Sequence, residues 1–474
     1  MEVGESVSVC NGMIRLQLLK IACERLAITR NGVNAMSVWD ALVGQKRVSA
    51  QLKAVAEGDP KAIAQSWLIC GSPGAGRSNV ARAFAAALES PDRGASDEPT
   101  RITQEVLAGT HPDVKVLKTD RVTIGIDEVR DLIETSEQTP SISPWRIIII
   151  EDVDRMLERT TNVLLKEIEE PSAHAIWLLC APSAQDVLPT IRSRTRVVNL
   201  AVPRTSDVAD YLVSAYEVEP ALASRAARLS QGHIGVAKLY AGVSNDVQAG
   251  DGDDETDGGR SGHVVGTPTK KRNPSGVTTG RKVKGKGRGK AVLGRDQDPL
   301  RVLHDRDDLV VGVLSLGRAS DAVLLAERLI DSAKSQAQSD IERDVARQEH
   351  DFRQANGLDD DERIPPQLRS AYNSIGKKDD VKRRVTRRSR DVLDRSINTM
   401  ASIYRDVSVI QNDAEDAAGL INLENRDAIT DLASRLTREG AVQRMDAIAT
   451  ARRRLNGNGN QLLDFEALLC ALIV

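Results

Sequence analysis

Five short apolar runs, separated by helix-length segments, constrain the fold of this chain more than any other feature of its sequence. The runs are four or five residues long and rich in β-branched residues and leucine; they span residues 67–70, 114–117, 147–150, 176–180 and 196–200. Such runs are typical of strands that are buried on both faces of a parallel sheet. The segments 78–89, 127–138 and 154–170 have the length and the spacing of helices. This alternation predicts an α/β domain with a five-stranded parallel sheet and helices on both faces.

Changes in composition divide the rest of the chain. Residues 1–35 are either an extension in front of the first domain or the product of an early start codon, and the α/β domain takes residues 36–203. Residues 204–242 carry apolar residues at helical spacing, which predicts a small helical domain. Residues 243–298 have too few apolar residues to fold and are expected to be disordered, first acidic and then basic. Residues 299–474 show only helical patterns, which predict an all-α domain.

The net charge of the chain hides one strongly basic segment. The whole chain has 65 Lys and Arg residues against 68 Asp and Glu residues, a net charge of −3. Residues 260–295 hold eleven of the basic residues and no acidic one, so the remainder has 54 basic against 68 acidic residues, a net −14. This segment either attracts nucleic-acid phosphates without reading sequence or is a solvated segment without a specific role. With 4 Trp, 5 Tyr and 3 Phe, a broad base-stacking platform is not expected.

The cysteines and the apolar segments exclude several classes of protein. The five cysteines are far apart in the sequence and form no CxxC pair, so neither a disulfide framework nor a cysteine-rich zinc site is expected, and a reducing cytosol fits. No run of 18 apolar residues exists, so no transmembrane helix is expected. The helical stretch 14–26 contains charged residues and lacks a cleavage site, unlike a signal peptide.

A glycine-rich turn follows the first apolar run and precedes a helical segment. Gly71, Gly74 and Gly76 have the layout of a P-loop, in which backbone N–H groups face a phosphate at the start of a helix. Ser78 stands where a hydroxyl would reach magnesium, but Arg77 occupies the position of the usual lysine. Because arginine is longer and forked, this exchange is not conservative. The alternative is a tight strand-to-helix turn without a ligand, and hydrolysis of a nucleotide is not expected.

The third apolar run ends in acids, as in a Walker B motif. Glu151 and Asp152 follow the run, in the reverse of the usual Asp-Glu order. In that motif the first acid orders magnesium and the second polarises the attacking water. A longer first carboxylate crowds the metal, and a shorter second one does not reach the water. The reversal therefore also disfavours hydrolysis, and helix capping by Asp152 or Asp154 is the alternative role.

The order of motifs resembles that of the clamp-loader AAA+ proteins. The P-loop and the acid-ended run are followed by Leu164-Leu165-Lys166, Glu169-Glu170-Pro171 and Ser193-Arg194-Thr195. The resemblance implies an AAA+ domain, a helical lid and a helical collar that serves oligomerisation. It also implies that Arg194, next to Ser193, is an arginine finger inserted into the ATP site of a neighbouring subunit, although Thr195 stands where cysteine is usual. The alternatives for Arg194 are a solvated surface arginine and an intrachain ion pair.

Within this family the chain resembles the delta-prime type of subunit of bacterial DNA polymerase III. The supporting residues are Val43-Gly44-Gln45, His111-Pro112-Asp113-Val114 and the segment 124–130, together with Gly235, which stands about where an ATPase subunit has its sensor arginine. The resemblance implies a hetero-pentamer with gamma/tau and delta subunits, which places the sliding clamp on primed DNA in the cytoplasm. In that complex the chain would be a largely non-hydrolysing stator within the polymerase holoenzyme, a nucleotidyltransferase.

The same resemblance bears on cofactors. No cofactor is required, and ATP with magnesium is at most weakly bound. Clamp-loader domains often carry four zinc-binding cysteines after the P-loop helix, but residues 89–106 contain none, so no zinc and no other metal is expected. His111 is expected to be structural or to lie at the surface.

Two other functions stay open at this point. The first is an active ATPase of the gamma/tau type, and the second is a protein that tethers DNA through its basic segment. The mixed-charge stretch 377–395 is interpreted as a solvated helix face, with a subunit or DNA contact as the alternative.

Overall fold

The computed structural model describes residues 37–243 and 299–474, apart from residues 97–98, 120–122, 360–361, 456 and 458. The expected extension 1–35 and, from residue 244 on, the acidic-then-basic segment lie outside the described residues. Within the described part of the chain, no helix has both the length and the apolar character needed to cross a bilayer.

The α/β domain contains the expected parallel sheet. Its strands are β1 (Ser66–Cys70), β2 (Val114–Leu117), β3 (Arg146–Ile150), β4 (Ala175–Ala181) and β5 (Arg196–Asn199). The strand order is β2-β3-β4-β1-β5, and every neighbouring pair is parallel. Each of the five predicted runs is therefore a strand, and their bounds differ from the prediction by one residue at most. This confirms the α/β fold class, with an all-helical region after it.

The prediction that all five strands are buried on both faces is correct only for the centre of the sheet. Every residue of β1, β3 and β4 is buried, whereas β2 and β5 have one buried residue each, Val114 and Val198, and their other residues are partly or fully exposed. The reason is their position, because β2 and β5 form the two edges of the sheet.

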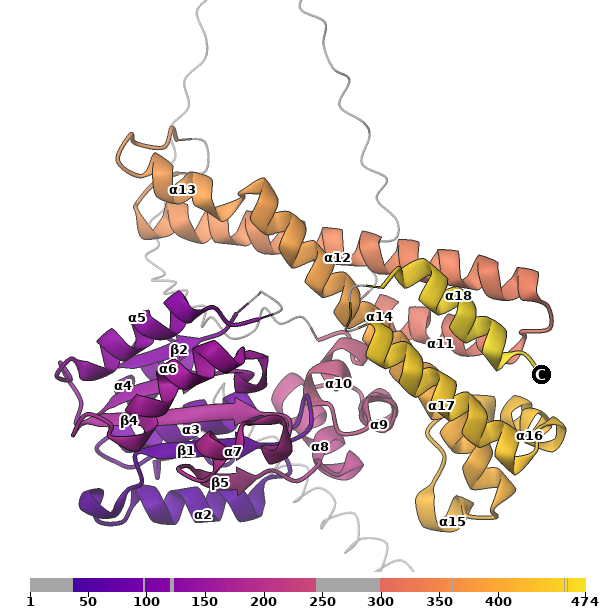
Figure 1. Ribbon diagram of the computed structural model, residues 1–474, viewed down its shortest axis with the longest axis horizontal. Helices are drawn as coiled ribbons and strands as arrows, with labels where there is room; N and C mark the ends of the chain where they lie inside the picture. The colour runs from indigo at the N-terminus through magenta and orange to yellow at the C-terminus, as the bar shows by residue number, and fades with distance from the viewer. Residues whose placement is uncertain are drawn as a thin grey trace, which may run out of the picture.

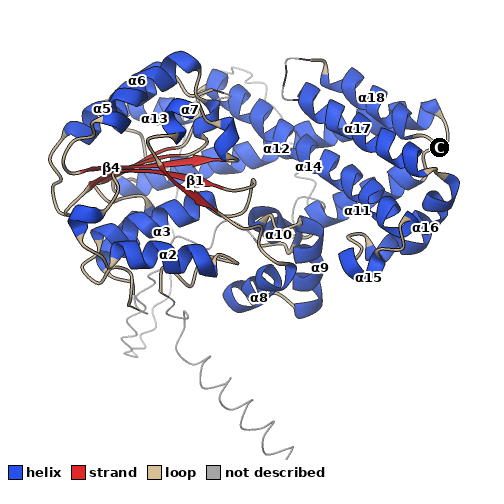
Figure 2. Cartoon of the chain, turned by 60° about the horizontal axis from the view of Figure 1, so that its bottom comes forward, coloured by secondary structure: helices blue, strands red, loops and turns tan. Residues whose placement is uncertain are grey.

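Helices cover both faces of the sheet, as Figure 2 shows. On one face, α2 (Lys46–Ala56), α3 (Arg77–Glu89) and α4 (Arg101–Ala108) share a core with Trp67 and Ile69 of β1. On the other face, α5 (Ile126–Glu137), α6 (Glu158–Glu169) and α7 (Pro189–Arg192) pack with Leu68 and Cys70 of the same strand. Successive residues of a strand point to opposite faces, and here both faces are apolar.

One expected helix is broken. The segment 154–170 was predicted as a single helix, but the structure has a 3₁₀ turn, Val153–Arg155, followed by α6 from Glu158. Between them Met156 is extended and forms a parallel bridge with Ile124. The N–H of Ile124 donates to the carbonyl of Arg155 at 3.1 Å. This tertiary contact holds the chain extended where local spacing alone favours a helix.

The lid and the collar contain helices and connecting turns, and no strand, among their described residues. The lid consists of α8 (Thr205–Tyr216), α9 (Pro220–Ser230) and α10 (Ile234–Tyr240). The collar consists of α11 (Arg301–Leu314), α12 (Ala319–Ala355), α13 (Arg369–Ile375), α14 (Lys378–Gln411), α15 (Glu415–Ala418), α16 (Arg426–Arg435), α17 (Arg438–Leu455) and α18 (Gln461–Leu472). Further 3₁₀ turns are Pro60–Ala62, Ala184–Asp186 and Leu423–Asn425.

The helices α12 and α14 are the longest of the described helices, and they pack against each other. Their far halves, joined through α13, extend from the collar over the α/β domain in Figure 1. Near its C-terminal end α14 is buried in the collar core, where the Tyr404 hydroxyl donates to the Leu472 carbonyl at 3.0 Å. The arm formed by α12, α13 and α14 thus belongs to the collar but reaches back to the first domain.

Several buried polar groups lie at the N-terminal end of β2. The Asp113 carboxylate is fully buried, accepts hydrogen bonds from the backbone N–H groups of Ser141, Ile142 and Ser143, and pairs with Arg146 at 3.1 Å. His111 is also buried and accepts from the Asp113 N–H through Nδ1, so its role is structural. Burial raises the pKa of the nearby Glu89 carboxyl to about 8.

Glu89 leads to a prediction about pH. The folded protein keeps the Glu89 proton up to a pKa of about 8, whereas the unfolded chain releases it near 4.5. Since the folded state binds more protons between these values, the free energy of unfolding falls as the pH rises through this window. We expect Glu89→Gln to remove this pH-dependent part of the free energy of unfolding. In the wild type it amounts to a loss of roughly 1–4 kcal/mol between pH 4.5 and pH 8.

The measurement is urea unfolding of the wild type and of Glu89→Gln at several pH values. Glu57→Gln, which changes an exposed carboxyl at the end of α2, is the matched control and should follow the wild type. Parallel pH profiles for the wild type and Glu89→Gln would contradict the prediction.

Candidate functional site

The glycine-rich turn joins β1 to the start of α3. Gly74 and Gly76 have φ angles of +79° and +95°, in the left-handed region that favours glycine. Gly76 is the N-cap of α3 and provides no side-chain cap, so the first N–H groups of the helix stay free of a capping side chain. Gly71 lies against Leu200, where an added Cβ would approach the Leu200 Cβ to 2.9 Å. The conformation of this turn therefore requires glycine at positions 74 and 76 and leaves no room for a side chain at Gly71.

The Arg77 guanidinium is paired with a carboxylate that follows β3 and does not extend unpaired from the glycine-rich turn. Its Nη2 is 3.0 Å from Oδ1 of Asp152, and its side chain is 12% exposed. Arg155 approaches the other carboxylate oxygen of Asp152 at 3.4 Å. Ser78 follows as the second residue of α3. The residue in the lysine position of the P-loop is thus committed to a carboxylate of the same chain.

The carboxylate of Glu151 is also paired with an arginine of α3. Oε1 of Glu151 is 3.2 Å from Nη2 of Arg82, one turn further along α3, and the Glu151 side chain is 11% exposed. Asp152 occupies the N-cap position of the 3₁₀ turn at Val153–Arg155, but its side chain makes no capping hydrogen bond. The capping alternative for Asp152 is therefore wrong, and both acids are partners of arginines from α3.

These contacts bear on whether magnesium and ATP fit. Magnesium needs carboxylate oxygens and waters in a nearly octahedral arrangement. Here guanidinium groups lie against both acids, so a cation would have to displace them first. The donor set in this arrangement does not fit a magnesium nucleotide. Elsewhere in the described part of the chain, no group of three or more His, Cys, Asp or Glu side chains is placed to hold a metal ion.

The lid covers the glycine turn. The N–H of Ile234, at the start of α10, donates to the carbonyl of Gly74 at 3.1 Å. The His233 ring lies directly against Gly74, where an added Cβ would come within 2.1 Å of the His233 Cγ. Burial lowers the pKa of His233, and its Nδ1 accepts from the N–H of Val236 at 3.1 Å. A neutral ring thus caps α10 and closes over the loop, with Gly235 beside it.

Arg194 lies two residues after the end of α7, and its side-chain contacts are not with the P-loop. Its Nε is 2.8 Å from Oε1 of Glu169, and the two side chains are 41% and 44% exposed. Its Nη1 donates to the carbonyl of Thr190 at 3.1 Å and to the hydroxyl of Ser193 at 3.2 Å. In this chain alone, Arg194 therefore forms the exposed intrachain ion pair that was one of the alternatives.

The collar also reaches this edge of the sheet. Nη1 of Arg387, on α14, donates a hydrogen bond to the carbonyl of Thr119, just after β2. Further along α14, the positive charge of Arg395 faces His233 and adds to the lowering of its pKa, after burial. Arg388 pairs with Asp340 and Asp344 of α12. The stretch 377–395 is thus not only a solvated face, because part of it contacts the α/β domain.

The lid and the collar are joined by ion pairs. Arg225 of α9 pairs with Asp307 at 2.7 Å and with Glu424 at 2.9 Å, and Arg228 pairs with Glu424 at 2.6 Å. Sequence reasoning did not identify these contacts, nor the contacts of Arg82 and His233. Each depends on residues far apart in the chain, and no local spacing signals them.

Comparison with known proteins relates the α/β domain to a family. Residues 44–204 match the family model "DNA polymerase III, delta subunit". The DNA polymerase III subunit delta' of Pseudomonas aeruginosa is 32% identical over 162 residues, 33% of this chain and 49% of that protein. The subunit gamma of Buchnera aphidicola is 28% identical over 176 residues, 36% of this chain and 47% of that protein.

A solved structure of a DNA polymerase III gamma subunit-related protein from Thermotoga maritima is 16% identical, with 86% of this chain and 99% of that chain covered and a TM-score of 0.30. The chain spans about half the length of the first two curated relatives. The family match ends at residue 204, before the lid. Through residues 44–204, this chain is therefore similar to subunits of DNA polymerase III.

Proposed function

We propose that this chain is a delta-prime-like subunit of a DNA polymerase III clamp loader that does not hydrolyse ATP at its own P-loop. The observation that carries the proposal is the pair of contacts from α3, Arg77 to Asp152 and Arg82 to Glu151. The lid contact of His233 with Gly74 supports it from the other side of the loop.

ATP hydrolysis is not expected because these residues are unavailable to bind phosphate, magnesium and water. In nucleotide-hydrolysing P-loops, a lysine reaches the β- and γ-phosphates and acids order magnesium and water. Here the group in the lysine position neutralises the second acid, and Arg82 neutralises the first. Opening the site would break two partly buried ion pairs and move His233 off Gly74. Gly235 provides no cation at the start of α10.

The contacts between the three parts of the chain support the proposed role of a stator. The lid binds the P-loop through Ile234, the collar binds the lid through Asp307, and α14 binds the α/β domain through Arg387. Because each part contacts the other two, we propose that the subunit keeps one arrangement while its neighbours move.

Arg194 is proposed to act on a neighbouring subunit. Exposed ion pairs such as Arg194 with Glu169 contribute only about 0–1 kcal/mol, so exchanging Glu169 for a phosphate costs little. A guanidinium supplied in trans stabilises the charge that develops on a γ-phosphate. Ser193, whose hydroxyl donates to Thr190 and accepts from Arg194, is proposed to position the turn.

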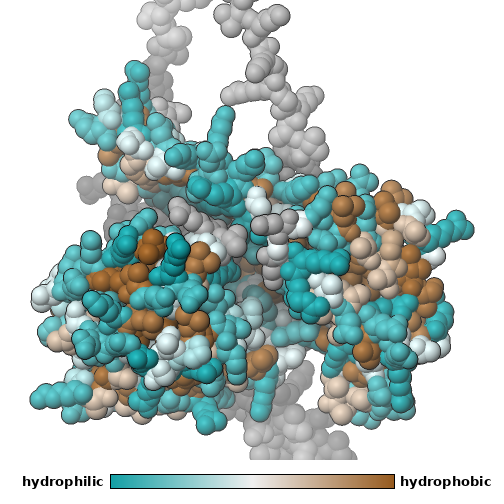
Figure 3. Space-filling view, in the orientation of Figure 1, coloured by the Kyte–Doolittle hydropathy of each residue, from teal (hydrophilic) through white to brown (hydrophobic). Residues whose placement is uncertain are grey.

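The partners are proposed from the family and from the surface of the collar. The proposed complex is a hetero-pentamer with gamma/tau and delta subunits that loads a sliding clamp onto primed DNA, in the cytoplasm. Figure 3 shows apolar residues gathered on the collar around α18 and the beginning of α12. The exposed large apolar residues on these helices include Val323, Leu324 and Leu463. An apolar face of this kind is typical of a protein contact.

The second candidate, an active gamma/tau-type ATPase, has support from relatives carrying that name. The gamma/tau subunit of Mycobacterium tuberculosis is 31% identical over 170 residues, 35% of this chain and 29% of that protein. The Arg77 and Arg82 contacts favour the stator instead. The basic segment on which the DNA-tethering alternative depends lies outside the described residues.

The first test is ATP turnover by the isolated chain. We expect no hydrolysis above background, and Arg77→Ala should leave this result unchanged. The same variant should lower the free energy of unfolding by about 1–3 kcal/mol, because Asp152 loses a charged hydrogen bond. Clear turnover by the wild type that disappears in Arg77→Ala would favour the gamma/tau-type ATPase.

The second test concerns Arg194 in a reconstituted loader. We expect Arg194→Ala to lower DNA-stimulated ATP hydrolysis and clamp loading by about tenfold or more, since an arginine finger acts on the transition state. Arg192→Ala, which changes an exposed arginine two residues earlier, at the end of α7, is the matched control and should behave as the wild type. Assembly, followed by size-exclusion chromatography, should be intact in both. Full activity of Arg194→Ala in an assembled loader would refute the finger.

The third test concerns the contact between the collar and the α/β domain. We expect Arg387→Ala to speed amide hydrogen exchange at residues 117–119, at the end of β2, about threefold to tenfold, the effect of losing one net hydrogen bond. Arg383→Ala is the control, because Arg383 pairs with Asp380 on its own helix. Equal exchange in Arg387→Ala and the control would show that Arg387 of α14 does not restrain the α/β domain after β2.

A further inference from the structure

A cavity of about 480 Å³ lies between the arm helices α12 and α14 and the beginning of α18. Its lining combines the side chains of Val381 and Val385 with several polar groups, among them three lysines. No residue of the P-loop or of the acid pair lines it. The volume is in the range of pockets that hold small organic ligands. The cavity is therefore a separate candidate site, at the collar rather than at the sheet.

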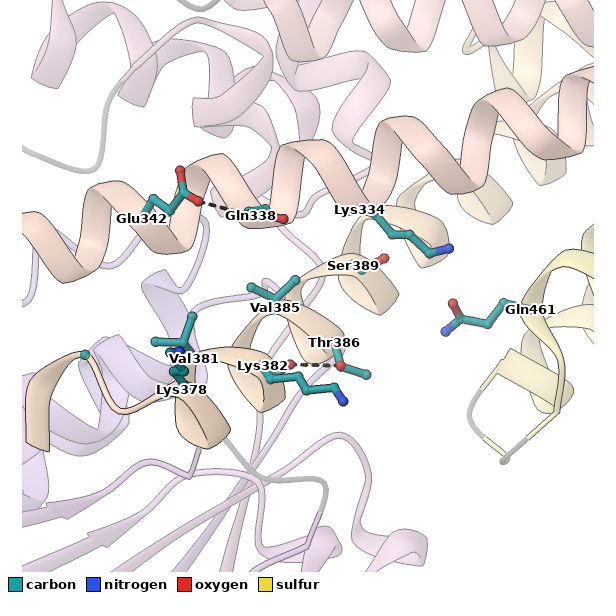
Figure 4. Close-up of a pocket in the computed structure, with 11 residues that line it drawn as sticks. Lys334, Gln338, Glu342, Lys378, Val381, Lys382, Val385, Thr386, Ser389 and Gln461 are labelled. Atoms are coloured by element: carbon teal, nitrogen blue, oxygen red, sulfur yellow. Dashed lines mark hydrogen bonds between the residues drawn. The ribbon is translucent and has the colours of Figure 1, made fainter. Parts of the chain in front are cut away.

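The lining carries an excess of positive charge. Lys334, Lys378 and Lys382 line the cavity, and none of them has an ion-pair partner among the described residues. The one lining carboxylate, Glu342, already accepts a hydrogen bond from Gln338 at 3.0 Å. Figure 4 shows Lys334 and Lys382 extending toward the side where Gln461 lies, whereas the Glu342 carboxylate points away from them. The space between α14 and α18 thus receives ammonium groups without an opposing acid.

Ser389 provides a second and independent observation. It is only 5% exposed, it lines the cavity, and its hydroxyl has no hydrogen-bond partner within the described ranges. A serine within a helix commonly donates to the carbonyl four residues earlier, as the Thr386 hydroxyl does to Lys382 at 2.9 Å. Buried polar groups are normally satisfied, so an unpartnered hydroxyl in a cavity calls for a ligand atom or a water molecule.

The beginning of α18 adds to the positive electrostatic potential of the cavity. Gln461 is the first residue of this 12-residue helix, and its side chain lines the cavity. The N-terminal end of a helix carries a partial positive charge and favours anions. Lysine ammonium groups, a hydroxyl and an amide are all donors for anionic oxygens, and phosphate accepts several such bonds at once.

We propose that this cavity binds the phosphate groups of a small-molecule ligand, either inorganic polyphosphate or an organic phosphate of nucleotide size. The inference does not depend on the function proposed above. The lining contains no aromatic side chain, so it offers no stacking surface for bases, which disfavours a nucleic-acid strand as the occupant. Val381 and Val385 provide an apolar wall for the body of an organic phosphate.

The test is isothermal titration of the full chain with inorganic tripolyphosphate, pyrophosphate and ADP. We expect saturable tripolyphosphate binding that the double variant Lys334→Gln/Lys382→Gln weakens at least about tenfold. Lys115→Gln/Lys377→Gln, which removes the same charge outside the cavity, should bind within about twofold of the wild type. Arg77→Ala, the P-loop control, should also match the wild type. Ser389→Ala should weaken binding by about threefold.

The two sources of phosphate are distinguished within the same series. Tighter binding of ADP than of pyrophosphate, lost in the cavity variant, identifies an organic phosphate; equal binding identifies polyphosphate itself. The proposal is overturned if no probe saturates up to about 10 mM, if the cavity variant binds as the wild type does, or if binding depends on Arg77. It is also overturned if a single-stranded oligonucleotide, and not tripolyphosphate, responds to the cavity variant.

Discussion

The ion pair between Arg77 and Asp152 determines what the carboxyl edge of the sheet can do. It joins the turn after β1 to the turn after β3, with β4 between these strands. Two adjacent acids at such an edge repel each other unless cations balance them, and α3 supplies Arg77 and Arg82 for both. The loop that could have enclosed a phosphate is thereby tied to the acids, and the lid closes on it through His233.

Most of the α/β fold could be predicted from the sequence, because its centre is built from apolar runs. The runs that became β1, β3 and β4 are buried on both faces, so hydrophobic length alone identified them. The edge strands were found as well, but their exposure depends on strand order, which local patterns do not contain. The break at Met156 was missed for a similar reason, since it is imposed by the bridge to Ile124.

The candidate site was only partly visible in the sequence. Arg77 in the lysine position and the order of Glu151 and Asp152 indicated altered chemistry, because residue types at known spacing carry that information. The sequence could not show that the Arg77 guanidinium pairs with Asp152, nor that the His233 ring lies against Gly74. Ion pairs and close contacts between distant segments are set by tertiary geometry. The solvated face expected for α14 failed in part, because the Arg387 contact joins residues 268 positions apart.

The pairwise contacts among the α/β domain, the lid and the collar have a mechanical consequence. Three bodies joined in a closed loop cannot hinge at one joint without straining another, whereas bodies joined in a line can bend at either joint. A load applied to the collar is thus transmitted to the carboxyl edge of the sheet instead of being absorbed between the domains. In the complex proposed above, torque from moving neighbours would reach the surface around Arg194 with its direction preserved.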